Sequence, residues 1–224
     1  MSFSLNETEA LIKRAARGAG LPWGLAQEAA FAGRWLAACD LDGPWLLAGL
    51  LEQNTDIPLS NLTPETDGLD WHGPGDHLCP LICGTALSDA ASHWQGRHNW
   101  ADIVITGVSH PLLMLPFVAS LALRANMTFS LEWEGVRVAS DGNKVSVSGP
   151  KDAVNTFARV RVTCRATSQV GTALSELVKP ALRAQLTEKC YQQLSHLAWL
   201  TLAPATQQSR DQGAGAGSGL KDND

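Results

Sequence analysis

The sequence predicts an α+β protein in which an antiparallel sheet of four to five strands carries helices from both termini. Three observations predict this fold. Apolar residues recur at helical spacing near both ends of the chain. Strict alternation of apolar and polar residues runs through the middle, and turn-forming Gly, Asn and Asp residues separate the alternating segments.

The N-terminal part predicts three helices. Asn6 and Glu9 have the spacing of a capping box, and Gly18 ends the apolar face that follows them. Residues 23–39 predict a second helix, and residues 44–52 a third that opens with a proline. The second helix has a stripe of small side chains, which we expect to pack closely on another helix: Ala26, Ala29, Ala30, Gly33 and Ala37.

The middle of the chain predicts the sheet. After a long loop over residues 54–76, the alternating segments predict four strands in residues 127–165, with a short helix at 151–158. Residues 101–107 predict a fifth strand, followed by an apolar helix that Ser109 would cap. The last part, residues 172–202, predicts helix broken at Pro180.

Composition indicates one folded unit. Hydrophobic residues make up 45% and charged residues 17% of the 224 residues, which is ordinary for a globular protein. We therefore expect a single domain over residues 1–203, and a glycine-rich tail over residues 204–224 that is flexible or folds back onto it.

Charge and cysteine usage exclude some partners. The net charge of −5 gives no electrostatic basis for binding nucleic acid or an anionic membrane. The longest apolar stretch, residues 111–123, is too short to span a bilayer. Five scattered cysteines do not form a disulfide framework, so we expect a cytoplasmic protein.

One cluster has zinc-binding residue types. Imidazole and thiolate are the preferred zinc ligands, and four such side chains lie within twelve residues: His72, His77, Cys79 and Cys83. Their spacing matches no zinc module, and the apolar neighbours of the cysteines favour buried thiols instead. A metal site is the lesser of these two interpretations.

The tail and the first helix offer candidate binding residues. Gly213, Gly215 and Gly217 can expose backbone N–H groups to an anion, although the composition favours a disordered tail over an anion site. Arg17 and Trp23 flank a glycine corner and can bind a carboxylate or an aromatic group. Solvated ion pairs at helical spacing are the favoured interpretation of the charged residues in this region.

Several motifs together resemble an uncharacterised proteobacterial family that is known only as a domain of unknown function. The N-terminal motif is SLNETE followed by AARGAGLPWGLA, and the central motifs are residues 79–80, 84–89 and 111–117. The C-terminal motif is PAT, SR, GAGAG and a final DND. The resemblance implies a functional tail, with Arg210, Asp222 and Asp224 near a site whose neighbours are Asn6, Arg17 and Trp23.

Two functions remain open from the sequence. The first is an enzyme, or a subunit of one, in small-molecule catabolism, because tryptophans and a long loop near histidines are typical of pockets. The second is a non-catalytic accessory protein that forms a homo-oligomer or binds a protein partner through its tryptophans and its Ala/Gly helix face. Neither a cofactor nor a substrate is indicated.

Overall fold

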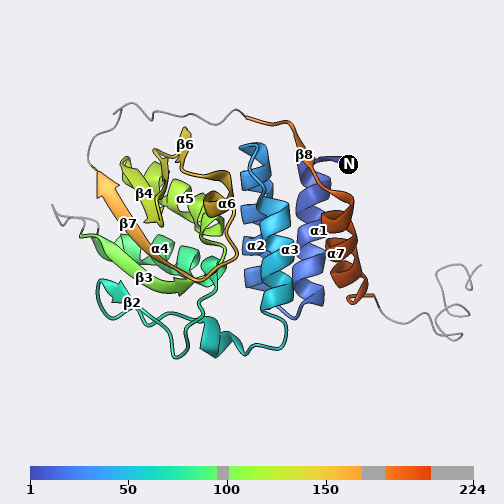
Figure 1. Ribbon diagram of the computed structural model, residues 1–224, viewed down its shortest axis with the longest axis horizontal. Helices are drawn as coiled ribbons and strands as arrows, with labels where there is room; N and C mark the ends of the chain where they lie inside the picture. The colour runs from blue at the N-terminus through green and yellow to red at the C-terminus, as the bar shows by residue number, and fades with distance from the viewer. Residues whose placement is uncertain (95–100, 168–179, 203–224) are drawn as a thin grey trace, which may run out of the picture.

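Helices from both ends of the chain form one side of the molecule, and a six-stranded sheet forms the other (Figure 1). The computed structural model describes residues 1–94, 101–167 and 180–202. One hydrophobic core cluster contains side chains from both sides. Within the described residues, no helix is both long enough and apolar enough to cross a membrane.

Four helices stand side by side in the helical part (Figure 1). They are α1 (Leu5–Gly18), α2 (Trp23–Ala38), α3 (Gly43–Gln53) and α7 (Glu188–Trp199). A two-stranded antiparallel sheet joins the N-terminus to the segment before α7: β1 (Ser2–Ser4) and β8 (Arg183–Gln185). The prediction of helix directly after the break at Pro180 is therefore wrong over β8, while residues 172–179 lie outside the described part.

The first helix begins earlier than the sequence predicts. Ser4, and not Asn6, is the N-cap: the Ser4 hydroxyl accepts from the Glu7 N–H, and the Glu7 carboxylate accepts from the Ser4 N–H. Both residue pairs have capping-box spacing, but Ser4 is the last residue of β1, so strand pairing fixes where the helix starts.

The Ala/Gly face of α2 packs against helices of the same chain, as predicted. A Cβ atom on Gly33 would lie 2.3 Å from Ile12 Cδ1 and 2.6 Å from Leu47 Cδ1. The small side chains therefore let α2 lie close to both α1 and α3. This face is buried, so it is not available to a protein partner.

The α+β prediction is confirmed, but the sheet is mixed and has six strands in the order β2-β3-β7-β4-β5-β6. The five predicted strands pair antiparallel: β3 (Ile103–Val108), β4 (Thr128–Trp133), β5 (Val136–Ser140), β6 (Val145–Ser148) and β7 (Val160–Thr167). The sixth, β2 (Asp70–Trp71), pairs parallel to β3 within the expected loop, which also contains the short helix η1 (Leu59–Leu62). Two residues are too few for a periodic signal.

The helices that cover the sheet come from the middle of the chain. They are α4 (Pro80–Trp94) and α5 (Leu115–Ala125), the latter preceded by the 3-10 turn η2 (Pro111–Met114). The predicted packing of the terminal helices on the sheet is wrong, because α1 and α7 bury their apolar faces on each other. The second helix joins the two parts, and its Phe31 ring meets Phe117 of α5 edge-on at 5.9 Å.

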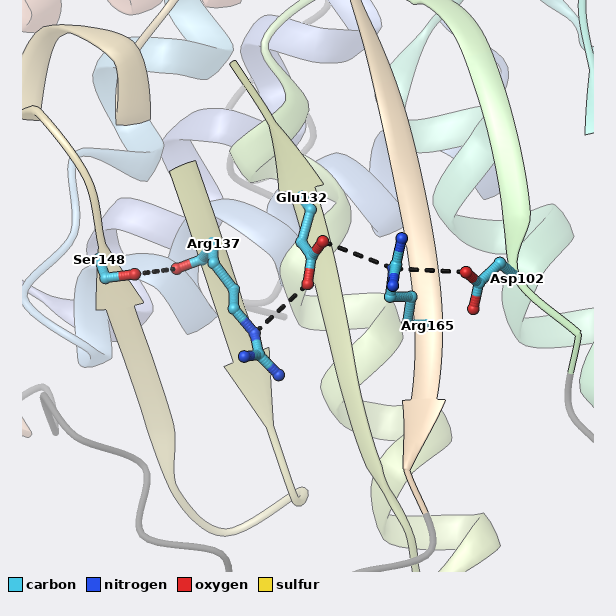
Figure 2. A network of polar contacts seen from close by, with 5 residues as sticks. All are labelled: Asp102, Glu132, Arg137, Ser148 and Arg165. Carbon is cyan, nitrogen blue, oxygen red and sulfur yellow. Dashed lines mark hydrogen bonds and ion pairs between the residues drawn. The ribbon is translucent and has the colours of Figure 1, made fainter. Parts of the chain in front are cut away.

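The other face of the sheet carries paired charges (Figure 2). Glu132 on β4 lies 3.5 Å from the Nε atoms of both Arg137 and Arg165, and Arg165 Nε lies 3.4 Å from Asp102. The Ser148 hydroxyl extends this ladder by donating to the Arg137 carbonyl oxygen. These side chains remain one-third to three-fifths exposed, so water screens their interactions.

Candidate functional site

A buried group of polar side chains lies at the end of β3, where the sheet meets the helical part. His77 comes from the loop before α4, whereas Ser109 and His110 join β3 to η2. Their exposed fractions are 7% for His77 and zero for the other two. Buried polar groups of this kind need a structural or functional reason, because leaving water costs free energy.

A glycine brings the two segments together. Gly107 has a φ of +88° and lies at an irregularity in the pairing of β3 with β7. A Cβ atom there would lie 2.9 Å from the Asp76 carbonyl oxygen. Leu78 then donates its N–H to the Gly107 carbonyl at 2.8 Å, which places the neighbouring His77 beside Ser109.

The Ser109 hydroxyl and the His77 ring form a hydrogen-bonded pair. The distance from Ser109 Oγ to His77 Nε2 is 3.0 Å. Burial, and then the charge of Arg159, lower the pKa of His77, so its ring is neutral near pH 7. A neutral ring nitrogen that faces a hydroxyl can take its proton, which is how histidine activates serine.

His110 is held in an unusual backbone conformation. Its φ of 47° and ψ of 52° place it in the left-handed region, which is uncommon for a residue other than glycine. Burial, and then the proximity of His77, lower the pKa of its ring to about 4. Neither of its ring nitrogens, nor Nδ1 of His77, has a hydrogen-bond partner among the described residues.

An aromatic ring connects this centre with the surface. Phe157, between α6 (Lys151–Val154) and β7, packs its ring centroid 4.3 Å from that of His110 and 4.4 Å from that of Trp45. The two non-histidine rings also line a surface hollow of about 550 Å³. We call it the α3–α6 hollow, and its lining includes Asp42, Trp45, Lys151, Asn155, Phe157 and Cys190.

The sequence predicts Ser109 as a helix cap and gives no candidate site role to Ser109, His110 or Phe157. In the structure His110 is the N-cap of η2, and Ser109 bonds to His77 instead. The available signal was the run Gly-Val-Ser-His-Pro after a buried strand, because polar residues between a strand and a helix often belong to sites.

The four candidate metal ligands do not come together. His72 is exposed, with Nδ1 3.8 Å from Glu65, whereas His77 bonds to Ser109. Cys79 and Cys83 are buried, and burial raises the pKa of Cys79 to about 11 and that of Cys83 well above its ordinary value. No three His, Cys, Asp or Glu side chains of the described ranges are placed to hold one metal ion.

The remaining candidates are partly brought together. The Arg17 guanidinium carbon lies 4.5 Å from the centroid of the Trp23 ring, and Arg17 also donates to the Leu21 carbonyl oxygen. Asn6 lies eleven residues before Arg17 on the same helix, about 16 Å away at 1.5 Å per residue. The tail candidates lie outside the described residues: Arg210, Gly213, Gly215, Gly217, Asp222 and Asp224.

Comparison with known proteins bears on the N-terminal third of the chain. No curated protein matches the sequence. The central and C-terminal motifs that suggested a resemblance lie beyond the part that a family model matches. Residues 3–77, which run from β1 to His77, match the model of a family described as a protein of unknown function (DUF3726), and this confirms the predicted resemblance to a domain of unknown function.

Proposed function

We propose that the protein is an enzyme of small-molecule metabolism that transfers or hydrolyses a small acyl group at Ser109. The observation that carries this proposal is the 3.0 Å contact between Ser109 Oγ and His77 Nε2 in a site closed to water. A serine beside a neutral imidazole is the minimal arrangement for nucleophilic acyl transfer.

Each group has a role in the proposed reaction. Ser109 Oγ attacks the carbonyl carbon of an ester or thioester while His77 Nε2 takes the hydroxyl proton. His77 then gives that proton to the departing alcohol or thiol. In the second half of the reaction His77 Nε2 takes a proton from a water molecule, which attacks the acyl carbon. The bond to Ser109 Oγ breaks, His77 returns the proton to that oxygen, and the acid leaves. His110 supplies an N–H that no described group accepts, which suits the charge that develops on the acyl oxygen.

The volume of the α3–α6 hollow limits the size of the proposed substrate. About 550 Å³ suits a small molecule, and Phe157 both lines the α3–α6 hollow and contacts His110. Ser109 is fully buried, so a substrate reaches it only if neighbouring side chains move, and we assign this movement to the Phe157 ring. That ring is 38% exposed and follows a helix of a single turn.

Labelling with a fluorophosphonate, followed by mass mapping of the peptides, tests the proposal. We expect one label on Ser109, no label in Ser109→Ala, and a rate at least ~10²-fold lower in His77→Asn. Ser195→Ala, which removes a hydroxyl from α7, should label as the wild type does. Phe157→Ala should label faster, since it opens the path to Ser109.

Two outcomes would reject the proposal. One is a folded protein, with an unchanged melting curve, that carries no label on Ser109. The other is a labelling rate that is the same with and without the His77 imidazole.

The alternative, a non-catalytic interaction protein, rests on exposed apolar side chains at the C-terminal end of α7. Trp199, Leu200 and Leu202 are each more than half exposed. Under this alternative, light scattering would detect a stable oligomer, and substitution of Ser109 would leave every binding activity unchanged.

A further inference from the structure

A second hollow lies on the opposite end of α7 from the proposed active site. Its lining comes from α1, the start of α2 and the end of α7, and its volume is about 690 Å³. We call it the α1–α7 hollow, and it is lined by Ala10, Lys13, Arg14, Arg17, Trp23, Leu200 and Thr201. We propose that it binds a small aromatic carboxylate.

Positive charge dominates the polar part of this lining. Lys13 and Arg14 lie four and three residues before Arg17 on α1, the spacings that place side chains on the same side of a helix. No carboxylate of the described residues lies within ion-pair distance of any of them. The chain as a whole has a net charge of −5, so three cations in one concave place, without a carboxylate partner in the described ranges, favour an anion there.

Arg17 is oriented before any ligand arrives. Its guanidinium lies on the Trp23 ring at 4.5 Å and donates one N–H to the Leu21 carbonyl. A guanidinium has five N–H donors in a rigid plane, so donors remain for a ligand. Fixing the side chain in advance lowers the entropy that binding would otherwise cost.

The rest of the lining is apolar. Trp23 is 67% exposed, and Leu200 is 52% exposed. The end of α7 approaches α1 closely: a Cβ atom on Gly18 would lie 1.7 Å from the Leu197 carbonyl oxygen. This approach brings Leu200 to the hollow, where it and the indole form a surface for a flat ring.

Charge and shape together select the ligand class. A planar carboxylate matches the paired N–H groups of a guanidinium, and an aromatic body matches the indole and the leucine. A singly charged carboxylate is favoured over a doubly charged phosphate ester, because stripping water from a second charge beside apolar walls costs more free energy. The concave shape favours a small molecule over a flat membrane surface.

Calorimetric titration of the full chain with matched probes tests this site. We expect 2-naphthoate to bind at least ~10-fold more tightly than 2-naphthamide, which has the same shape without the charge. Arg14→Gln and Trp23→Leu should each weaken 2-naphthoate several-fold, about 3–10-fold. Arg161→Gln, which removes a cation from the sheet, should leave the affinity unchanged.

Four results would overturn the proposal. Equal binding of the acid and the amide would remove the role of charge, and unchanged affinity in both variants would place the ligand elsewhere. Tighter binding of 2-naphthyl phosphate than of 2-naphthoate would reject the carboxylate class. A dimer that Trp23→Leu dissociates, without any probe binding, would assign the hollow to a second copy of the chain.

Discussion

Polar side chains on the open face of the sheet differ from those in the buried centre at the end of β3 in their exposure to water and in their hydrogen-bond partners. On the open face, the side chains of Glu132, Arg137 and Arg165 are partly exposed to water and form ion pairs, with Glu132 contacting both arginines (Figure 2). In the centre, His77 and His110 are cut off from water and leave three ring nitrogens without a partner in the described residues. These three make up half of the six buried side-chain polar atoms that lack one there.

Exposed ion pairs and buried imidazoles without a partner have different effects on the stability of the fold. Exposed pairs contribute little individually, but they cost nothing to keep, since water solvates each charge when the pair opens. A buried imidazole without a partner costs free energy for as long as the protein is folded. Such a cost is retained most readily where the group binds or reacts with something else, which is why the centre, and not the ladder, supports the proposed function.

Among the changes that test this contrast, lowering the pH should have the largest effect on the free energy of unfolding. The ordinary pKa of 6.5 for histidine falls to about 4 in His110, so between these values the unfolded chain binds a proton that the folded protein excludes. The free energy of unfolding therefore decreases as the pH falls from 6.5 to 4, by about 3 kcal/mol from this residue. Urea titrations at pH 7 and pH 4 measure the decrease.

His110→Asn is the control for this measurement, because asparagine tolerates the left-handed backbone and does not titrate. The decrease between the two pH values should be smaller in the variant by about 3 kcal/mol. The lowered pKa of His77 adds a loss of the same sign in both proteins, so the difference isolates His110. If the stability of the two proteins changed in parallel with pH, the pKa of His110 would not be lowered in the folded protein.

Adding a methyl group at Gly49, beside Phe157 and His110, should have the next largest effect on stability. Gly49→Ala would place a Cβ atom 2.6 Å from Phe157 Cε2 and 3.1 Å from His110 Nε2, so the phenyl ring must move. We expect a loss of about 2 kcal/mol in thermal or urea unfolding. In contrast, Gly24→Ala on α2 meets nothing within 4 Å and should be neutral or stabilise by up to ~1 kcal/mol. If both variants melted alike, the close packing of Phe157 would be wrong.

The regular part of this fold could be predicted because its signals are local. The alternation in residues 127–133 arises from one strand whose apolar side chains share one face of the sheet, although Thr128 and Ser130 on the other face are buried as well. The stripe around Gly33 arises from one helix between two others. What failed depended on distant partners. The pairing of β1 with β8, nearly the whole chain apart, moved the first cap from Asn6 to Ser4, and the same pairing replaced predicted helix by strand at 183–185.

The candidate sites also differ in whether they depend on residues near in sequence or on distant ones. Arg17 and Trp23 lie six residues apart across one corner, so the sequence predicted their proximity, and they do stack. His77 and Ser109 lie thirty-two residues apart, and their contact depends on the positive φ of Gly107. No periodicity carries that information, because a glycine in a strand predicts only that some backbone approaches closely.

Removing the central carboxylate of the ladder should have the smallest effect. Glu132→Gln leaves Arg137 and Arg165 without their shared partner, and we expect a loss of about 0.5–1 kcal/mol at low ionic strength. In 1 M salt the loss should nearly vanish, since the screening length falls to about 3 Å. Glu134→Gln removes the same charge from the neighbouring turn, where no described cation pairs with it, and should change stability less. A loss well above 1 kcal/mol that persists in salt would mean that the ladder is not screened by water, and the contrast with the buried centre would then no longer hold.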